Sequence, residues 1–139
     1  MKKFITSITI VALAIIYLPA CKKSSDTQPQ QTTLQKIQAK WQLVNIVDND
    51  HYSGSDHIST TPGTANDYID FRTDGKVYSS ISGNMDVATY SLTGSDTKIL
   101  IDGTDTYDIK TLTSNSFILY IKQPSGGSDF DETTINMKK

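Results

Sequence analysis

From Trp41 to its last residue, the chain is a succession of short segments in which apolar and polar residues alternate, separated by turn signals. An alternation of period two is typical of half-buried strands, and the Asp74-Gly75 and Asp102-Gly103 steps are strong signals for hairpin turns. No segment between them has the helical pattern of a β-α-β unit. The pattern therefore predicts eight strands, at residues 41–47, 68–71, 76–82, 88–92, 98–101, 106–112, 117–121 and 133–137.

Consecutive hairpin turns favour pairing between neighbouring strands, so the simplest topology is an antiparallel up-and-down meander. A sheet of this many short strands exposes its edges unless it closes into a barrel. The alternative is an immunoglobulin-like sandwich, which places a tryptophan deep in the fold, whereas the only tryptophan, Trp41, opens the first strand. We therefore expect an all-β, eight-stranded barrel. A short helix over residues 33–39, capped by Thr33, is expected to precede it.

The N-terminus has a different pattern. Lys2 and Lys3 precede a mostly apolar run over residues 4–17, which Leu18-Pro19-Ala20-Cys21 closes. This order is typical of a secretory signal peptide. A cysteine directly after the cut resembles the lipobox of bacterial lipoproteins, and that resemblance implies that Cys21 receives lipid and becomes the first mature residue. The alternatives are an uncleaved anchor, for which the run is shorter than the ~20 apolar residues of a membrane span, and ordinary secretion.

Three regions follow from these patterns: a lipoprotein signal peptide at 1–20, a disordered tether at 21–33 and a barrel domain at 34–139. The tether after Cys21 is polar and has no aliphatic or aromatic residue with which to form a core. Removal of 1–20 leaves 11 basic and 15 acidic residues, a net charge of −4. That charge gives no footprint for nucleic acid. We expect a protein of the cell envelope, lipid-anchored at the outer membrane and facing the periplasm or the surface.

Within the barrel domain, Ala39-Lys40-Trp41 after a short helix resembles the Gly-x-Trp motif of lipocalins. The fuller pattern is similar to the small lipocalin-like domain of bacterial lipoproteins, over roughly residues 36–139. It comprises residues 40–44, 68–75, 90–94 and 107–113. The resemblance implies that Trp41 plugs one barrel end and that the domain binds a small apolar or amphipathic molecule outside the cytoplasm.

Alternate positions predict which side chains fill the barrel, namely Trp41, Leu43, Ile69, Phe71, Tyr90, Leu92, Ile99, Ile101, Tyr107, Ile109, Phe117, Leu119, Ile135 and Met137. Eight strands enclose a space that side chains fill or that holds one small ligand, and both outcomes stay open. If a cavity exists, Tyr78, Tyr90, Tyr107 and Trp41 are the candidate ligand contacts, because an aromatic ring with a polar group suits an amphipathic guest.

The stretch from Asp48 to Asp67 shows no apolar pattern and is expected to be a solvated loop or a lid. It contains His51 and His57 with several aspartates, but their spacing matches no metal motif, so neither a metal nor another cofactor is expected. Aspartates near residues 102–108 and 129–132 are expected to cap turns. No nucleophile elbow or phosphate loop is present, so we expect no enzyme. The alternative function is a filled barrel that docks on another envelope protein.

Overall fold

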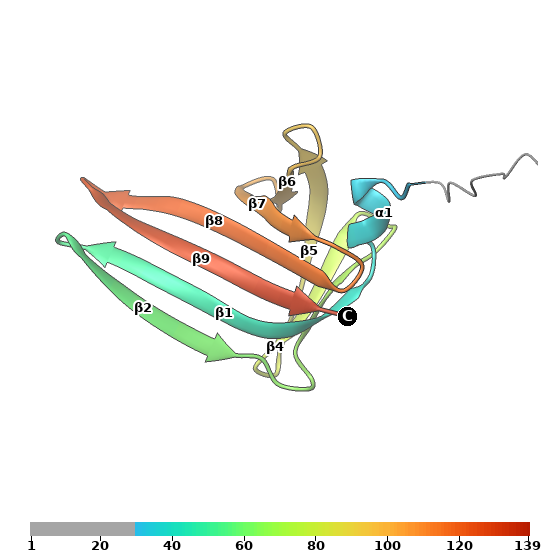
Figure 1. The fold of residues 1–139 in the computed structure, drawn as a ribbon, viewed down its shortest axis with the longest axis horizontal. Coiled ribbons are helices and arrows are strands. Elements are labelled where there is room, and N and C mark those ends of the chain that lie inside the picture. The colour runs from blue at the N-terminus through green and yellow to red at the C-terminus, as the bar shows by residue number, and fades with distance from the viewer. Residues whose placement is uncertain (1–29) are drawn as a thin grey trace, which may run out of the picture.

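The structure is a computed structural model in which residues 30–139 are described (Figure 1). It contains one helix, α1 (Thr33–Ile37), and nine strands: β1 (Lys40–Tyr52), β2 (Ser55–Pro62), β3 (Tyr68–Phe71), β4 (Lys76–Ile81), β5 (Asn84–Thr93), β6 (Lys98–Ile101), β7 (Asp105–Leu112), β8 (Ser116–Gly126) and β9 (Asp129–Lys138). The predicted signal peptide, Cys21 and most of the predicted tether lie outside the described residues. Within residues 30–139, α1 is far too short to cross a membrane, and no other helix is present that could do so.

Eight of the strands close into a barrel. From β3 to β9, each strand pairs antiparallel with the next along the chain, and β1 joins the two ends. The start of β1, Lys40–Gln42, pairs with β3, while β1 pairs with β9 from Gln42 to His51. The predicted fold class, an antiparallel eight-stranded barrel with a short N-terminal helix, is confirmed.

The structure corrects the expectation of a loop between Asp48 and Asp67. The chain continues in β1 to Tyr52, turns at Ser53-Gly54 with φ values of 52° and 76°, and returns as β2 to Pro62. Positive φ at both central residues is the geometry of a tight hairpin turn. The sequence pattern missed this hairpin because alternation reports a strand only when one of its faces is buried, and every residue of β2 is exposed.

This hairpin and the distal parts of β8 and β9 form a four-stranded extension that we call the wing, comprising residues 45–52, 55–62, 121–126 and 129–134. Figure 1 shows β8, β9, β1 and β2 side by side, running away from the barrel with β2 on the outer edge. A bulge between Leu43 and Asn45 marks the root of the wing. The bulge lets both Leu43 and Ile46 face inward, while Val44 is exposed.

The barrel end beneath α1 is closed by aromatic packing. Trp41 and Phe117 have ring centroids 5.2 Å apart, Phe71 lies 5.7 Å from Phe117, and all three are buried. Ile37 of α1 is fully buried against them. The N-cap of the helix is one residue earlier than predicted, because Thr32 accepts a hydrogen bond from the Gln35 N–H.

The predicted interior of the barrel is confirmed. All fourteen side chains assigned to it by alternation are either buried in the core or packed against it. Ile37 and Val77 complete that core, and Val77 follows from the same alternation because it pairs in register with the inward-facing Phe71.

Candidate functional site

A cavity of about 160 Å³ that is partly open to solvent lies inside the barrel. Phe71 forms part of its lining and also packs in the aromatic plug, so the cavity begins where the plug ends. Eight apolar side chains line it: Ile69, Phe71, Val77, Ile81, Ala88, Ile101, Leu119 and Ile135. Three polar residues, Ser79, Asp86 and Tyr107, complete the lining. The result is an apolar pocket with a few polar groups, as small-molecule sites usually are.

Strand alternation positions this lining. In β4, Val77, Ser79 and Ile81 point inward, and in β5 Asp86 and Ala88 face them across the hairpin, with Val77 opposite Ala88 and Ser79 opposite Asp86. Ser79 and Ala88 are small, so these two strands do not fill the space in front of them. The cavity therefore exists where small side chains replace the bulky ones that fill the plug.

The polar lining of the cavity consists of two hydroxyl groups, from Ser79 and Tyr107, and the carboxyl group of Asp86. Burial raises the pKa of Tyr107, and the neighbouring Asp105 carboxylate raises it further, so its hydroxyl stays protonated at neutral pH. The Asp86 carboxylate accepts a hydrogen bond from the N–H of Val87 at 2.8 Å. Together, Ser79, Asp86 and Tyr107 offer hydrogen-bond donors and acceptors but no cation.

Of the four predicted ligand contacts, the structure places one, Tyr107, in the cavity wall. Tyr78 lies on the outer face of β4, where the Arg72 guanidinium covers its ring at 3.9 Å and Asp74 accepts from its hydroxyl at 3.4 Å. This corrects the placement of Tyr78 at the rim or wall. The physical reason is that Tyr78 alternates with Val77 and Ser79, which face inward.

Tyr90 and Trp41 belong to the closed end of the barrel. The Tyr90 hydroxyl donates to the carbonyl oxygen of Arg72 at 2.8 Å, and its ring packs edge-on against Phe71. Trp41 is fully buried in the plug. Neither lines the cavity, although Tyr90 borders a separate surface hollow of about 520 Å³ beneath α1.

Sequence reasoning missed Ser79, Asp86 and Ala88 as lining residues. The signal was present in the alternation of the strands, because every second residue of a strand faces the same way. Phe71 faces inward, so its partner across the Asp74-Gly75 hairpin, Val77, faces inward too, and so does Ser79 two residues further on. In the same way, Ala88 and Asp86 lie two and four residues before the inward-facing Tyr90 on one strand, so they face inward as well. Aromatic character alone favours Tyr78, whose side chain lies on the outer face of β4. Asp86 also lies before residue 88, where the sequence pattern placed the start of this strand, whereas β5 begins at residue 84.

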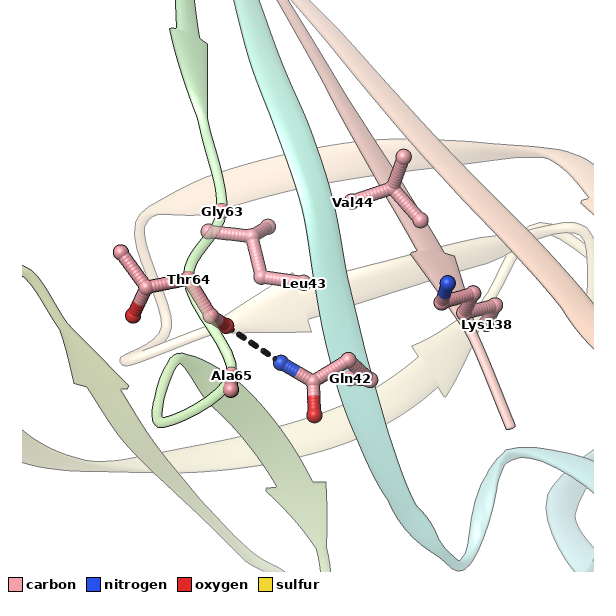
Figure 2. Close-up of a pocket in the computed structure, with 7 residues that line it drawn as sticks. All are labelled: Gln42, Leu43, Val44, Gly63, Thr64, Ala65 and Lys138. Carbon is pink, nitrogen blue, oxygen red and sulfur yellow. Dashed lines mark hydrogen bonds between the residues drawn. The ribbon is translucent and has the colours of Figure 1, made fainter.

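A second hollow, of about 390 Å³, lies at the root of the wing (Figure 2). Here Gln42 donates from Nε2 to the carbonyl oxygens of Thr64 at 2.6 Å and of Asp67 at 2.8 Å. This crevice is larger than the barrel cavity and, like it, open to solvent, but its polar groups already bond one another. We interpret it as the joint at which the chain leaves β2 and enters β3.

Alternation places the two histidine side chains on opposite faces of the wing, although both residues border one surface hollow of about 420 Å³. His51 Nδ1 lies 2.7 Å from an Asp56 oxygen and its ring stacks on Phe130 at 4.5 Å, whereas His57 pairs in register with Asp50. Among residues 30–139, no group of three or more histidine, cysteine, aspartate or glutamate side chains is arranged to hold a metal ion.

The aspartates near turns mostly serve the backbone or pair with lysines. Asp102 accepts from the N–H of Thr89 at 2.8 Å. Asp108 bonds Lys98 and Lys110, and these contacts lower its pKa. Such groups have structural partners and do not converge on the cavity.

An eight-stranded barrel encloses an interior that side chains fill or that holds one small ligand, and here an apolar cavity lies beside the filled plug. A family model described as "Lipocalin-like domain" matches residues 37–119, from the end of α1 to the middle of β8. Since the match covers more than half of the chain, this chain belongs to the lipocalin-like domain family. Members of this family are generally non-enzymatic binding proteins. No curated protein matches the chain.

Proposed function

We propose that this protein holds a small apolar or amphipathic molecule in the barrel cavity. The observation that carries the proposal is the cavity itself, about 160 Å³ within a lining of eight apolar and three polar residues. An enclosed apolar cavity of roughly 150 Å³ takes up a molecule the size of benzene. The barrel cavity has a similar volume, although it is partly open to solvent. A guest of that size gains from burial of its apolar surface at ~25 cal/mol per Å².

The size of the cavity limits which part of a guest can enter it. A single ring or a short alkyl chain fills the space. We expect a longer guest to leave the cavity beside Asp86, the exposed member of its polar lining, with Tyr107 also in the wall. These two side chains and Ser79 would then contact a polar group of the guest by hydrogen bonds. The proposed guest is therefore amphipathic, with its apolar part towards Phe71.

We also propose that the barrel is anchored to a membrane through lipid on Cys21, outside the cytoplasm and at the outer membrane. Support comes from the sequence: two lysines, an apolar run and a closing Ala20-Cys21 step. One acyl chain binds a membrane only reversibly, whereas two anchor stably. From Cys21 to Thr32, an extended chain reaches ~40 Å, which would keep the cavity near the membrane surface.

Native mass spectrometry of the full chain, purified from the cells that make it, tests the binding proposal. Ala88→Leu fills the cavity, and Val87→Leu is the matched control because Val87 is the exposed neighbour on the same strand. We expect an adduct on the parent and on Val87→Leu, and its loss from Ala88→Leu. A parent that stays bare after soaking in cell extract, or an Ala88→Leu variant that keeps the adduct at full occupancy, contradicts the proposal.

The anchor is tested by metabolic labelling with an alkyne fatty acid followed by membrane fractionation. We expect the parent to incorporate label and to sediment with membranes, and Cys21→Ser to lose both properties. Because Cys21 is the only cysteine, label on the serine variant would show that acylation occurs elsewhere and would contradict the assignment.

A second candidate function is a module that docks on another protein. The observation that favours it is the wing, whose outer strand β2 is exposed at every residue. This candidate does not exclude a guest in the barrel, because the wing and the cavity use different residues.

A further inference from the structure

The outer edge of the wing is an unpaired strand. β2 pairs with β1 on one side, and it is the terminal strand of the nine-stranded sheet on the other (Figure 1). An edge strand presents free N–H and C=O groups, and natural proteins usually protect such edges with lysine, proline or a bulge. β2 contains no lysine or arginine, its pairing with β1 is regular, and its proline, Pro62, stands at the end nearest the barrel.

The pairing of β1 with β2 shows which backbone groups are free. Gly63 donates its N–H to the carbonyl oxygen of Val44 at 2.8 Å. This bond shows which opposing residues of the two strands are hydrogen-bonded pairs and which are not. Hydrogen-bonded pairs recur every second residue in an antiparallel ladder, so the backbone groups of His57 and Ser59 face β1. The N–H and C=O groups of Asp56, Ile58 and Thr60 therefore point away from the sheet.

The side chains of β2 are compatible with an extended partner strand. Ile58, at the middle of the strand, is 69% exposed although isoleucine is β-branched and apolar. Tyr52, at the end of β1, is 65% exposed. Neighbouring threonine and serine residues carry no charge that would repel a partner, and threonine favours extended backbone.

We propose that β2 pairs antiparallel with β2 of a second copy of this chain, joining two wings into one continuous sheet. The strand is complementary to itself when Ile58 lies on the twofold axis. In that register Ile58 faces the Ile58 of the second copy, and Asp56 faces Thr60. The free groups of Asp56, Ile58 and Thr60 then form about six main-chain hydrogen bonds.

This register also opposes no like charges. Asp56 meets a threonine hydroxyl, which can donate to a carboxylate, and His57 meets Ser59. Antiparallel pairing places the two barrels at opposite ends of the joined sheet. A twofold, isologous contact of this kind is the commonest way in which identical chains associate. These features favour a second copy over an unrelated peptide as the partner.

Sedimentation equilibrium of the full chain in density-matched detergent tests the proposal. We expect the parent to form a dimer whose dissociation constant rises at least ~10-fold in Ile58→Lys, which places two charges face to face, and in Thr60→Pro, which removes a free N–H. Val87→Lys is the matched control, since Val87 is also exposed and apolar but lies on β5; its dissociation constant should equal that of the parent.

A second measurement does not depend on the strength of association. Ile58→Cys places two thiols on the proposed axis, where paired strands bring Cα atoms within disulfide range. We expect oxidation of this variant to give a peptide cross-linked between the two substituted positions, and Val87→Cys to give none. The proposal is overturned if the parent is monomeric and Ile58→Cys gives no cross-link. It is also overturned if the dimer persists unchanged in both Ile58→Lys and Thr60→Pro.

Discussion

The indole N–H of Trp41 donates a hydrogen bond to the carbonyl oxygen of Ile37 at 2.9 Å, and both side chains are fully buried. The bond joins the helix to the first strand at the point where the plug closes the barrel. The two residues are four apart in the sequence, so a side chain of β1 itself fixes the turn between α1 and β1.

Trp41→Phe should therefore destabilise the fold by about 2 kcal/mol, because it removes this hydrogen bond and leaves a small void in the plug. Chemical unfolding followed by circular dichroism measures the change. Tyr52→Leu, at an exposed site on the wing, should change the free energy of unfolding by less than ~0.5 kcal/mol. An equal loss in both variants would show that the plug has no special role.

Gly63 allows the close approach at the root of the wing. A Cβ at this position would lie 2.3 Å from the carbonyl oxygen of Leu43, so a strand must shift to accept it. Gly63→Ala should cost about 1–3 kcal/mol through overpacking. Gly75→Ala, whose cost comes only from its φ of 77° in open space, should cost about 1 kcal/mol, and thermal unfolding of both variants compares them.

The buried carboxylate of Asp67 ties the chain entering β3 to the turn between β4 and β5. It accepts from the N–H groups of Thr64 and Ser82, both at 2.8 Å, and these bonds lower its pKa below 3.8. A lowered folded-state pKa adds stability that is fully present above the unfolded value and is lost as pH falls through the folded value.

Asp67→Asn should therefore lower the melting temperature at pH 7. The gap between variant and parent should shrink as pH falls below about 3.8, first because the unfolded parent takes up a proton and then, at the lower folded-state pKa, because the folded carboxylate does. Thermal melts from pH 7 to pH 2 measure this gap. The exposed Asp96→Asn serves as control, and a gap that stays constant with pH would contradict the role of the charge.

On the outer face of β8, the Tyr120 hydroxyl donates to Glu132 at 2.7 Å, and this bond raises the pKa of Tyr120 to about 12. Lys122 bonds the same carboxylate oxygen at 3.1 Å, and both partners lower the pKa of Glu132. Titration of the Tyr120 Cζ resonance by NMR should give a midpoint near 12. In Glu132→Gln the midpoint should fall towards the ordinary value of 10, because the negative charge is gone.

The barrel and its core could be predicted from the sequence, and the cavity could be predicted only in part. Alternation assigns Tyr107 to the interior, and the structure puts it in the cavity wall. Aromatic character favours Tyr78 as a ligand contact, but its side chain faces outward, because its position in the alternation of β4 decides its direction. Whether the interior is filled or hollow depends on the fit of small side chains such as Ser79 and Ala88 against residues far away in sequence, which a local pattern does not contain.

The sequence by itself determined the antiparallel strands and the side chains of the core, because a strand with one buried face has apolar residues at every second position. It also determined the turns at Gly75 and Gly103, because a turn residue with a positive φ is usually glycine. Only the tertiary structure decided that Asp48–Pro62 is a strand pair and not a loop. Those strands are held by backbone pairing with β9 and with each other. Residues of β2 are all exposed and residues 45–49 of β1 are all half-buried, so neither segment leaves an alternation of buried and exposed side chains.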